Sequence, residues 1–191
     1  MYVFGGRRDE TYFDDLWALN METLTWELLF PMDGRTLTGL PTRPAARTNH
    51  ASAVHGTDLL IFGGSDGEYH YSDLWAFDTE QYMWKQVRSE GPNPRSREGH
   101  AMVIVDHTLW VFGGRGSAGK DLAELSSCDL RYPRWYCFKN VASTPAPRSE
   151  HVMVAVKDHV FVLGGFDSKS NATEPYTIHV LDTGTHRMRH L

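Results

Sequence analysis

Cysteine is scarce in this sequence of 191 residues, which contains only Cys128 and Cys137. Small secreted modules that rely on disulfides use more cysteines than this, so a disulfide-stapled fold is excluded. The two thiols flank an expected turn at Tyr132 and Pro133, and they could face each other across a hairpin. The simpler interpretation is that both are reduced and pack as small hydrophobic side chains. This interpretation follows from the cytoplasmic location that we predict, because the sequence shows neither a secretory signal nor a membrane span.

Long apolar runs and an excess of basic charge are also missing. No run approaches the roughly 20 apolar residues that span a bilayer, and residues 1–10 lack the pattern of a secretory signal. The formal charge is −5, from 19 basic and 24 acidic residues spread along the chain. We expect neither a membrane span nor a nucleic-acid partner, because phosphate binding requires a basic patch. With 41% hydrophobic residues and 12% aromatics, the chain can still bury a core.

Catalytic motifs are absent as well. There is no Gly-x-Ser-x-Gly nucleophile elbow and no P-loop. Residues 114–120 read Gly-Arg-Gly-Ser-Ala-Gly-Lys, but the spacing differs from that of a P-loop and no helix is expected to follow. We predict no catalytic residue, no metal site and no cofactor.

Four pairs of glycines, each preceded by a short apolar run, divide the sequence at intervals of about 50 residues, which indicates a structural repeat. The pairs are Gly5-Gly6, Gly63-Gly64, Gly113-Gly114 and Gly164-Gly165. After each pair comes a second apolar run that ends in Asp or Asn, and a large apolar residue follows further on. These residues are Trp26, Trp84, Trp135 and Met188. The short runs are separated by turn residues and lack helical spacing, so each repeat is predicted to be a four-stranded antiparallel unit.

An Arg-x-x-His motif precedes the second, third and fourth glycine pairs. It occurs as Arg47 to His50, Arg97 to His100 and Arg148 to His151. Three arginines and three histidines at equivalent positions could ring a channel and bind a metal or an anion. Repetition alone explains them, and we expect these side chains to satisfy backbone carbonyls before the inner strand of each unit.

Together, the glycine pair, the spaced tryptophan and the Arg-x-x-His motif resemble the kelch family along essentially the whole chain. The resemblance implies an all-β fold: a kelch-type β-propeller of four four-stranded antiparallel blades, in which the first blade lacks its inner strand. The expected blades are residues 1–30, 44–88, 94–139 and 145–191. Kelch rings usually close with about six or seven blades, so an incomplete ring is predicted. We expect either that the chain is part of a larger propeller or that it self-associates through the open blade edge, and a four-bladed ring is a third possibility.

Within such a fold the repeated residues have structural roles. The glycine pairs are expected where two backbones approach closely or where φ is positive, because a residue without Cβ does either at little cost. The tryptophans are expected to lie across the gap between consecutive blades, where a thin sheet can bury a large ring.

The connections between the second and third strands of each blade, and those between blades, emerge on one side, which we call the long-loop face. They are expected at residues 7–14, 30–48, 65–72, 89–99, 115–122, 140–150 and 166–175. Loops of variable length on a repeated scaffold are a candidate binding surface, and Arg and Tyr often anchor interfaces. We predict a protein or peptide partner that contacts Arg7, Arg8, Tyr12, Tyr69, Tyr71, Arg95, Arg97, Arg115 and Phe166.

The resemblance implies a non-catalytic protein-interaction scaffold, of the kind that organises cell polarity or the cytoskeleton. The substrate-recognition arm of a ubiquitin ligase is the alternative. A galactose-oxidase-like copper enzyme is a further alternative, because such enzymes also contain kelch-type blades. Their site needs a Tyr–Cys crosslink, whereas Tyr136 and Cys137 are adjacent in a predicted strand and point to opposite faces. We therefore predict that the chain is not an enzyme.

Overall fold

The computed structural model describes residues 1–30, 43–139, 141, 143–166 and 178–190. These residues form strands, turns and irregular connections, which confirms the predicted all-β class. In the ranges described there is no helix with the length and hydropathy needed to cross a membrane.

The strands form four antiparallel sheets, one for each predicted blade. Blade 1 contains β1 (Tyr2–Arg8), β2 (Thr11–Asn20) and β3 (Thr25–Phe30), and blade 2 contains β4 (Ala51–His55), β5 (Asp58–Phe62), β6 (Leu74–Asp78) and β7 (Met83–Gln86). Blade 3 contains β9 (Ala101–Val105), β10 (Thr108–Phe112), β12 (Leu125–Asp129) and β13 (Arg134–Phe138), and blade 4 contains β14 (Val152–Val156), β15 (His159–Leu163), β16 (His179–Asp182) and β17 (Arg187–His190). Within the described ranges, blade 1 therefore has three strands and lacks an inner strand, as predicted. A two-stranded sheet that the sequence did not predict joins β8 (Arg97–Glu98) to β11 (Arg115–Gly116).

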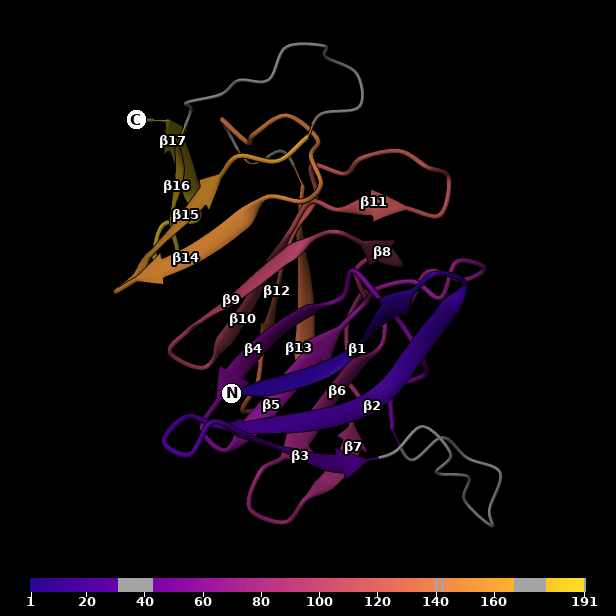
Figure 1. Ribbon diagram of the computed structural model, residues 1–191. Coiled ribbons are helices and arrows are strands. Elements are labelled where there is room, and N and C mark those ends of the chain that lie inside the picture. The colour runs from indigo at the N-terminus through magenta and orange to yellow at the C-terminus, as the bar shows by residue number, and fades with distance from the viewer. Residues whose placement is uncertain (31–42, 140, 142, 167–177, 191) are drawn as a thin grey trace.

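The blades stack face to face in a fan that runs from blade 1 to blade 4 (Figure 1). The inner strands β4, β9 and β14 lie side by side. The segments that precede them are joined by backbone hydrogen bonds: Gly99 N–H donates to Asn49 O at 2.8 Å, and Glu150 N–H donates to Gly99 O at 2.7 Å. All three residues have positive φ, of 53° for Asn49, 60° for Gly99 and 57° for Glu150. The described residues form this open fan and not a closed ring.

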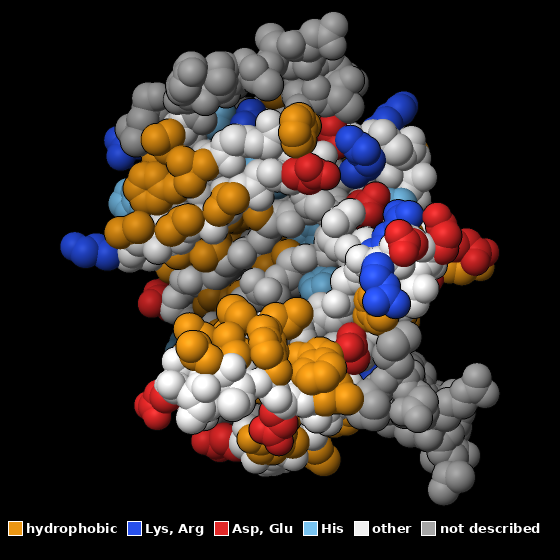
Figure 2. All heavy atoms as spheres, viewed as in Figure 1, with side chains coloured by type: hydrophobic (Ala, Val, Ile, Leu, Met, Phe, Trp, Pro, Cys, Tyr) orange, Lys and Arg blue, Asp and Glu red, His pale blue; other side chains and the backbone are white. Residues whose placement is uncertain are grey.

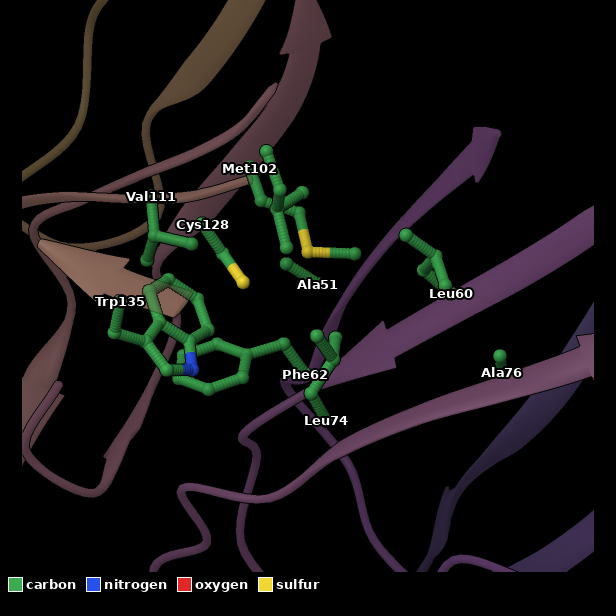
Figure 3. Packing of buried hydrophobic residues seen from close by; sticks show 10 residues of the cluster. Ala51, Leu60, Phe62, Leu74, Ala76, Met102, Val111, Cys128 and Trp135 are labelled. Atoms are coloured by element: carbon green, nitrogen blue, oxygen red, sulfur yellow. The ribbon is translucent and has the colours of Figure 1, made fainter. Parts of the chain in front are cut away.

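The hydrophobic core lies between the blades. We call the face of a blade that packs on the preceding blade its leading face, and the opposite face its trailing face. Between blades 2 and 3, the trailing side chains Phe62 and Leu74 pack near the leading side chains Val111 and Trp135 (Figure 3). Equivalent clusters lie between blades 1 and 2 and between blades 3 and 4. Because a middle blade is covered on both faces, its second strand is apolar almost throughout, as in the run 59–62 of β5.

The outer-strand tryptophans lie on the leading faces. Trp135 is 1% exposed, and its ring centroid lies 5.2 Å from that of Phe62. The ring centroid of Trp84 lies 5.2 Å from that of Phe4 in blade 1. Trp26 departs from the expected packing, since it is 50% exposed. No described blade precedes blade 1, so Trp26 has no trailing face to pack against.

Two apolar sheet faces are consequently left uncovered by the described residues. The leading face of blade 1 and the trailing face of blade 4 each present three side chains that are between 41% and 58% exposed: Val3, Trp26 and Leu28 on blade 1, and Val152, Val154 and Val156 on blade 4. Figure 2 shows hydrophobic side chains gathered where Figure 1 places blade 1 and β14.

Both cysteines are free thiols. In the hairpin of β12 and β13, Cys128 lies opposite Trp135, and Cys137 lies opposite Ser126. The two thiols are therefore on the same hairpin without facing each other directly. Burial raises the pKa of Cys128 to about 11, so this thiol stays protonated at neutral pH.

Candidate partner-binding face

In blades 1, 2 and 3, the first glycine of the pair packs against the Arg-x-x-His segment that precedes the next blade. A Cβ on Gly113 would lie 2.6 Å from both Arg148 O and His151 Cε1, which belong to the segment before blade 4. A Cβ on Gly114 would lie 2.8 Å from Glu98 O, in the segment before its own blade. Both glycines also have positive φ, of 66° and 91°. The pair is thus required by close backbone approach and by conformation together.

The motif arginine fixes the first glycine and the loop that follows it. Arg47 Nη1 donates to Gly63 O at 3.0 Å, and its two Nη atoms donate to the Asp73 carboxylate at 2.6 and 3.0 Å. The guanidinium carbon lies 4.0 Å from the ring centroid of Tyr71, whose hydroxyl donates to Asp66 at 2.6 Å. Burial alone would raise the pKa of Asp73, but the hydrogen bonds and charge of Arg47 hold it below its ordinary value. Tyr71 is therefore held within the loop and does not project freely.

Arg97 is the equivalent arginine of blade 3, and its predicted role as a partner contact is wrong. The residue is 0% exposed. Its Nη1 donates to Gly113 O at 2.9 Å, its Nε donates to Arg95 O at 2.9 Å, and its Nη2 forms an ion pair with Glu124. A partner cannot reach a guanidinium that is enclosed inside the repeat and already bonded there through each of its three nitrogens.

The motif histidines are uncharged at neutral pH. Burial, and to a smaller extent the neighbouring motif arginine, lowers the pKa of both His50 and His151 to about 4. The same two causes hold the pKa of His100 well below its ordinary value. Each imidazole packs edge-on against a phenylalanine of the preceding blade, with 5.5 Å between the ring centroids of His151 and Phe112. Neutral rings of this kind pack the blades together and offer no charge to an anion.

The long-loop face lies on the side of the fan that carries β8 and β11 (Figure 1), and charged side chains of both signs gather there (Figure 2). Several of the predicted contact residues are exposed on it. Arg8 extends from blade 1, Tyr69 from blade 2 and Phe166 from blade 4, and the two aromatic residues are each 60% exposed. Blades far apart in the sequence thus contribute to one face.

Blade 1 differs from the predicted loop at residues 7–14, because β1 continues to Arg8 and β2 begins at Thr11. The segment is therefore a tight hairpin. The Arg7 guanidinium carbon lies 5.4 Å from the ring centroid of Tyr12, and the Tyr12 hydroxyl packs against Gly67 of blade 2. Tyr12 consequently joins two blades and is only partly available to a partner.

The other two predicted arginines lie on the surface with acidic partners. Arg95 Nε lies 3.2 Å from a carboxylate oxygen of Glu124, and Arg115 Nε lies 3.4 Å from one of Asp121. Their side chains are 70% and 45% exposed. They can still contact another protein, although each charge is already matched within the chain.

Parts of the predicted connections 30–48, 140–150 and 166–175 lie outside the described residues.

Residues that the sequence did not single out also shape this face. Asn49 Nδ2 donates to Glu98 Oε2 at 3.2 Å, and His70 Nε2 lies 3.4 Å from Glu98 Oε1. These contacts join the segments before blades 2 and 3 to the loop that carries Tyr69. The signal that could have revealed them is the carboxylate that follows Arg97, where the other two motifs have a threonine and a serine.

Chemically, the face is suited to recognition. It combines exposed aromatic and guanidinium groups with backbone segments that the motif arginines and glycine pairs hold in place. Among the described residues, no group of three or more His, Cys, Asp or Glu side chains is placed to bind a metal ion.

Four-stranded antiparallel sheets that pack face to face, with their first strands adjacent, define a segment of a β-propeller. The KLHDC2/KLHL20/DRC7 Kelch-repeats domain model matches residues 1–165 and 77–191. The chain therefore belongs to the kelch-repeat family, as its glycine pairs indicated.

Several curated proteins are similar to the chain. Acyl-CoA-binding domain-containing protein 4 of Arabidopsis thaliana is 29% identical over 97% of this chain and 28% of its own length. Tip elongation aberrant protein 1 of Schizosaccharomyces pombe is 32% identical over 97% of this chain and 16% of its own length. N-(sulfonatooxy)prop-2-enimidothioate sulfolyase of Thlaspi arvense is 31% identical over 73% of this chain and 41% of its own length. The chain thus spans less than half the length of each of these relatives.

Proposed function

We propose that the chain is a non-catalytic scaffold that binds a partner protein or peptide through its long-loop face. The observation that carries this proposal is the exposure of Arg8, Tyr69 and Phe166 on one face of a framework held rigid by buried ion pairs. Exposed aromatic and arginine side chains on fixed backbone lose little entropy on binding, which favours affinity. Membership of the kelch-repeat family supports an interaction role.

Cell polarity is the setting that we favour for this scaffold. Its support is the similarity to Tip elongation aberrant protein 1, which extends over 97% of this chain. The alternative is the substrate-recognition arm of a ubiquitin ligase, for which the partner would be a protein destined for degradation. The free thiols of Cys128 and Cys137 fit the predicted cytoplasmic location. The identity of the captured partner separates the two settings.

The experiment is quantitative affinity capture with the intact chain as bait. A triple variant with Arg8→Ala, Tyr69→Ala and Phe166→Ala should lose the specific partner, because it removes the exposed anchors from the long-loop face. A matched control carries Met21→Ala and Tyr132→Ala, which are 64% and 81% exposed in turns on the opposite side. The control should retain the partner. If the control loses the partner and the triple variant retains it, the partner binds on the opposite side and the proposal is refuted.

An enzymatic function is the competing proposal, because the sulfolyase of Thlaspi arvense is among the similar proteins. The copper version of that proposal requires Tyr136 and Cys137 to converge on one metal. They are neighbours in β13, so their side chains leave the sheet on opposite faces, and Tyr136 is 49% exposed. We expect no stoichiometric copper in the purified chain after incubation with Cu²⁺ and desalting, as measured by plasma mass spectrometry. One bound copper per chain would favour the enzyme.

We also propose that two copies of the chain associate through the uncovered apolar faces. Each internal interface joins the trailing face of one blade to the leading face of the next. No described residue covers the trailing face of blade 4 or the leading face of blade 1, so a head-to-tail contact would repeat the internal geometry. Sedimentation velocity should show association that increases with concentration, and Trp26→Glu should abolish it. A wild-type chain that stays monomeric at all concentrations would refute the proposal.

A further inference from the structure

A groove lies between blades 3 and 4 on the side opposite the long-loop face, beside the β9–β10, β14–β15 and β16–β17 turns. Its volume is about 480 Å³. The groove is lined by Val105, Asp106, Thr108, Trp110, Ser127, Asp129, Tyr136, Phe138, Asp158, Thr183, Gly184 and His186. None of the residues proposed for the long-loop face contributes to it, so it is a separate candidate site.

The wall of the groove is aromatic. Trp110 and Phe138 are stacked, with 5.6 Å between ring centroids and 19° between ring planes. The ring centroid of His186 lies 4.9 Å from that of Phe138. Trp110 is 2% exposed, and its buried Nε1–H has no acceptor among the described residues. Tyr136 also lines the groove, and because it is 49% exposed, its ring is accessible to a ligand.

The rim of the groove is acidic. Three aspartates line it, whereas no lysine or arginine does. Asp129 is already paired with Arg131 at 2.9 Å, whereas the carboxylate of Asp158 is contacted by a described residue through Oδ1 alone, at 2.6 Å from Nδ1 of His159. Asp106 is exposed and makes no ion pair with a described residue. The carboxylates of Asp106 and Asp158 therefore remain to attract a cation, and planar cations also bind well to aromatic walls.

Blade 2 shows what the repeat places at the corresponding position. Tyr136 lies opposite Ser127 in blade 3, just as Lys85 lies opposite Ala76 in blade 2. Lys85 Nζ lies 3.2 Å from Asp58 Oδ2, so an internal cation occupies the acidic edge of that blade. In blade 3 tyrosine replaces the lysine and Thr108 replaces Asp58, so the carboxylates beside Tyr136 belong to other positions and have no internal lysine of this kind.

We propose that the groove between blades 3 and 4 binds an arginine side chain presented by a basic peptide. The guanidinium packs against the exposed ring of Tyr136, beside Phe138, and pairs with the carboxylates of Asp106 and Asp158. Arginine fits better than lysine because its planar guanidinium both stacks on rings and offers several N–H donors to carboxylates.

The test is a titration of the intact ¹⁵N-labelled chain with the peptide acetyl-Gly-Arg-Gly-Arg-Gly-amide. The indole N–H signal of Trp110, assigned from a Trp110→Phe variant, should shift in a saturable way. The same peptide with citrulline in place of arginine is nearly isosteric and uncharged, and it should bind at least about tenfold more weakly. Equal binding of the two peptides, or no shift of the Trp110 signal, would overturn the proposal.

Two variants test the site itself. Tyr136→Lys supplies an internal cation as blade 2 does, at a position that is 49% exposed, and it should abolish peptide binding. Asp106→Asn with Asp158→Asn should weaken binding at least about tenfold. The matched control, Glu22→Gln with Glu80→Gln, removes the same net charge from exposed turns on the same side and should leave binding unchanged. If control and groove variants weaken binding equally, the attraction is general electrostatics and the assigned groove is wrong. Because the long-loop residues are intact in every variant, this outcome is independent of the partner-capture experiment.

Discussion

A comparison of Gly113 with Gly164 can measure how much stability the next blade makes dependent on glycine at the first position of a pair. Both are the first glycine of their pair, with φ of 66° and 67°. A Cβ on Gly113 would lie 2.6 Å from Arg148 O and from His151 Cε1, whereas a Cβ on Gly164 would meet no described atom within 4 Å. The backbone conformation is thus matched, and only the next blade differs.

The expected costs follow from that difference. Gly164→Ala introduces left-handed strain alone, about 1–2 kcal/mol of lost unfolding free energy. Gly113→Ala introduces the same strain together with overpacking against a carbonyl oxygen that belongs to the backbone, which adds about 1–3 kcal/mol. Urea unfolding of the two variants, with unchanged m-values, measures the difference directly. Equal destabilisation would refute the idea that the next blade is what requires the first glycine.

Three further predictions concern single side chains. Trp135→Ala should lower the unfolding free energy by about 3–5 kcal/mol because the ring is 1% exposed, whereas Trp26→Ala, at 50% exposed, should cost less than half as much; equal costs in urea unfolding would contradict the packing described. Leu24 has a φ of 56° and its side chain is 70% exposed, so Leu24→Gly should relieve backbone strain and lose little packing. The variant should gain about 0.5–1 kcal/mol of unfolding free energy and melt at a higher temperature. An unchanged or lower melting temperature would count against backbone strain there. The pKa of His151 is lowered to about 4 in the folded chain and is about 6.5 when unfolded, so the folded state binds fewer protons between these values and stability falls as pH drops from 6.5 to 4. His151→Phe should reduce that fall by about 3 kcal/mol, and an identical pH profile for the variant and the wild type would show that the ring titrates normally.

The fold was predictable because its signals are repeated in register. Four glycine pairs and the spaced tryptophans predicted the sheets and the missing inner strand, since one residue type at one offset performs the same packing task in every blade. The β8–β11 pairing was not predictable, because two-residue strands have no periodicity to detect. The hairpin at residues 7–14 was also missed, since its polar composition resembles that of a loop.

The candidate site was less predictable than the fold, and Arg97 shows why. Residue type alone makes arginine a good interface anchor, but whether it faces a partner depends on contacts made far along the chain, here with Gly113 and Glu124. Local sequence distinguishes Arg97 from Arg95 only through the repeated motif. The groove beside Trp110 was missed for a similar reason, because it arises where blade 4 meets blade 3 and no single repeat contains it.

Neighbouring blades depend on one another through the glycine pair, the histidine and the tryptophan. This dependence explains why these residues have different surroundings at the two ends of the fan. The first glycine of a blade is constrained by the histidine segment of the next blade, and the tryptophan of a blade is buried by the trailing face of the preceding one. No described atom therefore lies near a Cβ on Gly164 where His151 lies near one on Gly113, and Trp26 is exposed where Trp135 is buried. Both differences concern one type of interface, in which the trailing face of one blade packs on the leading face of the next, and the described residues do not form it at either end. Any blade that docks on both, whichever chain supplies it, should bury Trp26 and make Gly164→Ala as costly as Gly113→Ala.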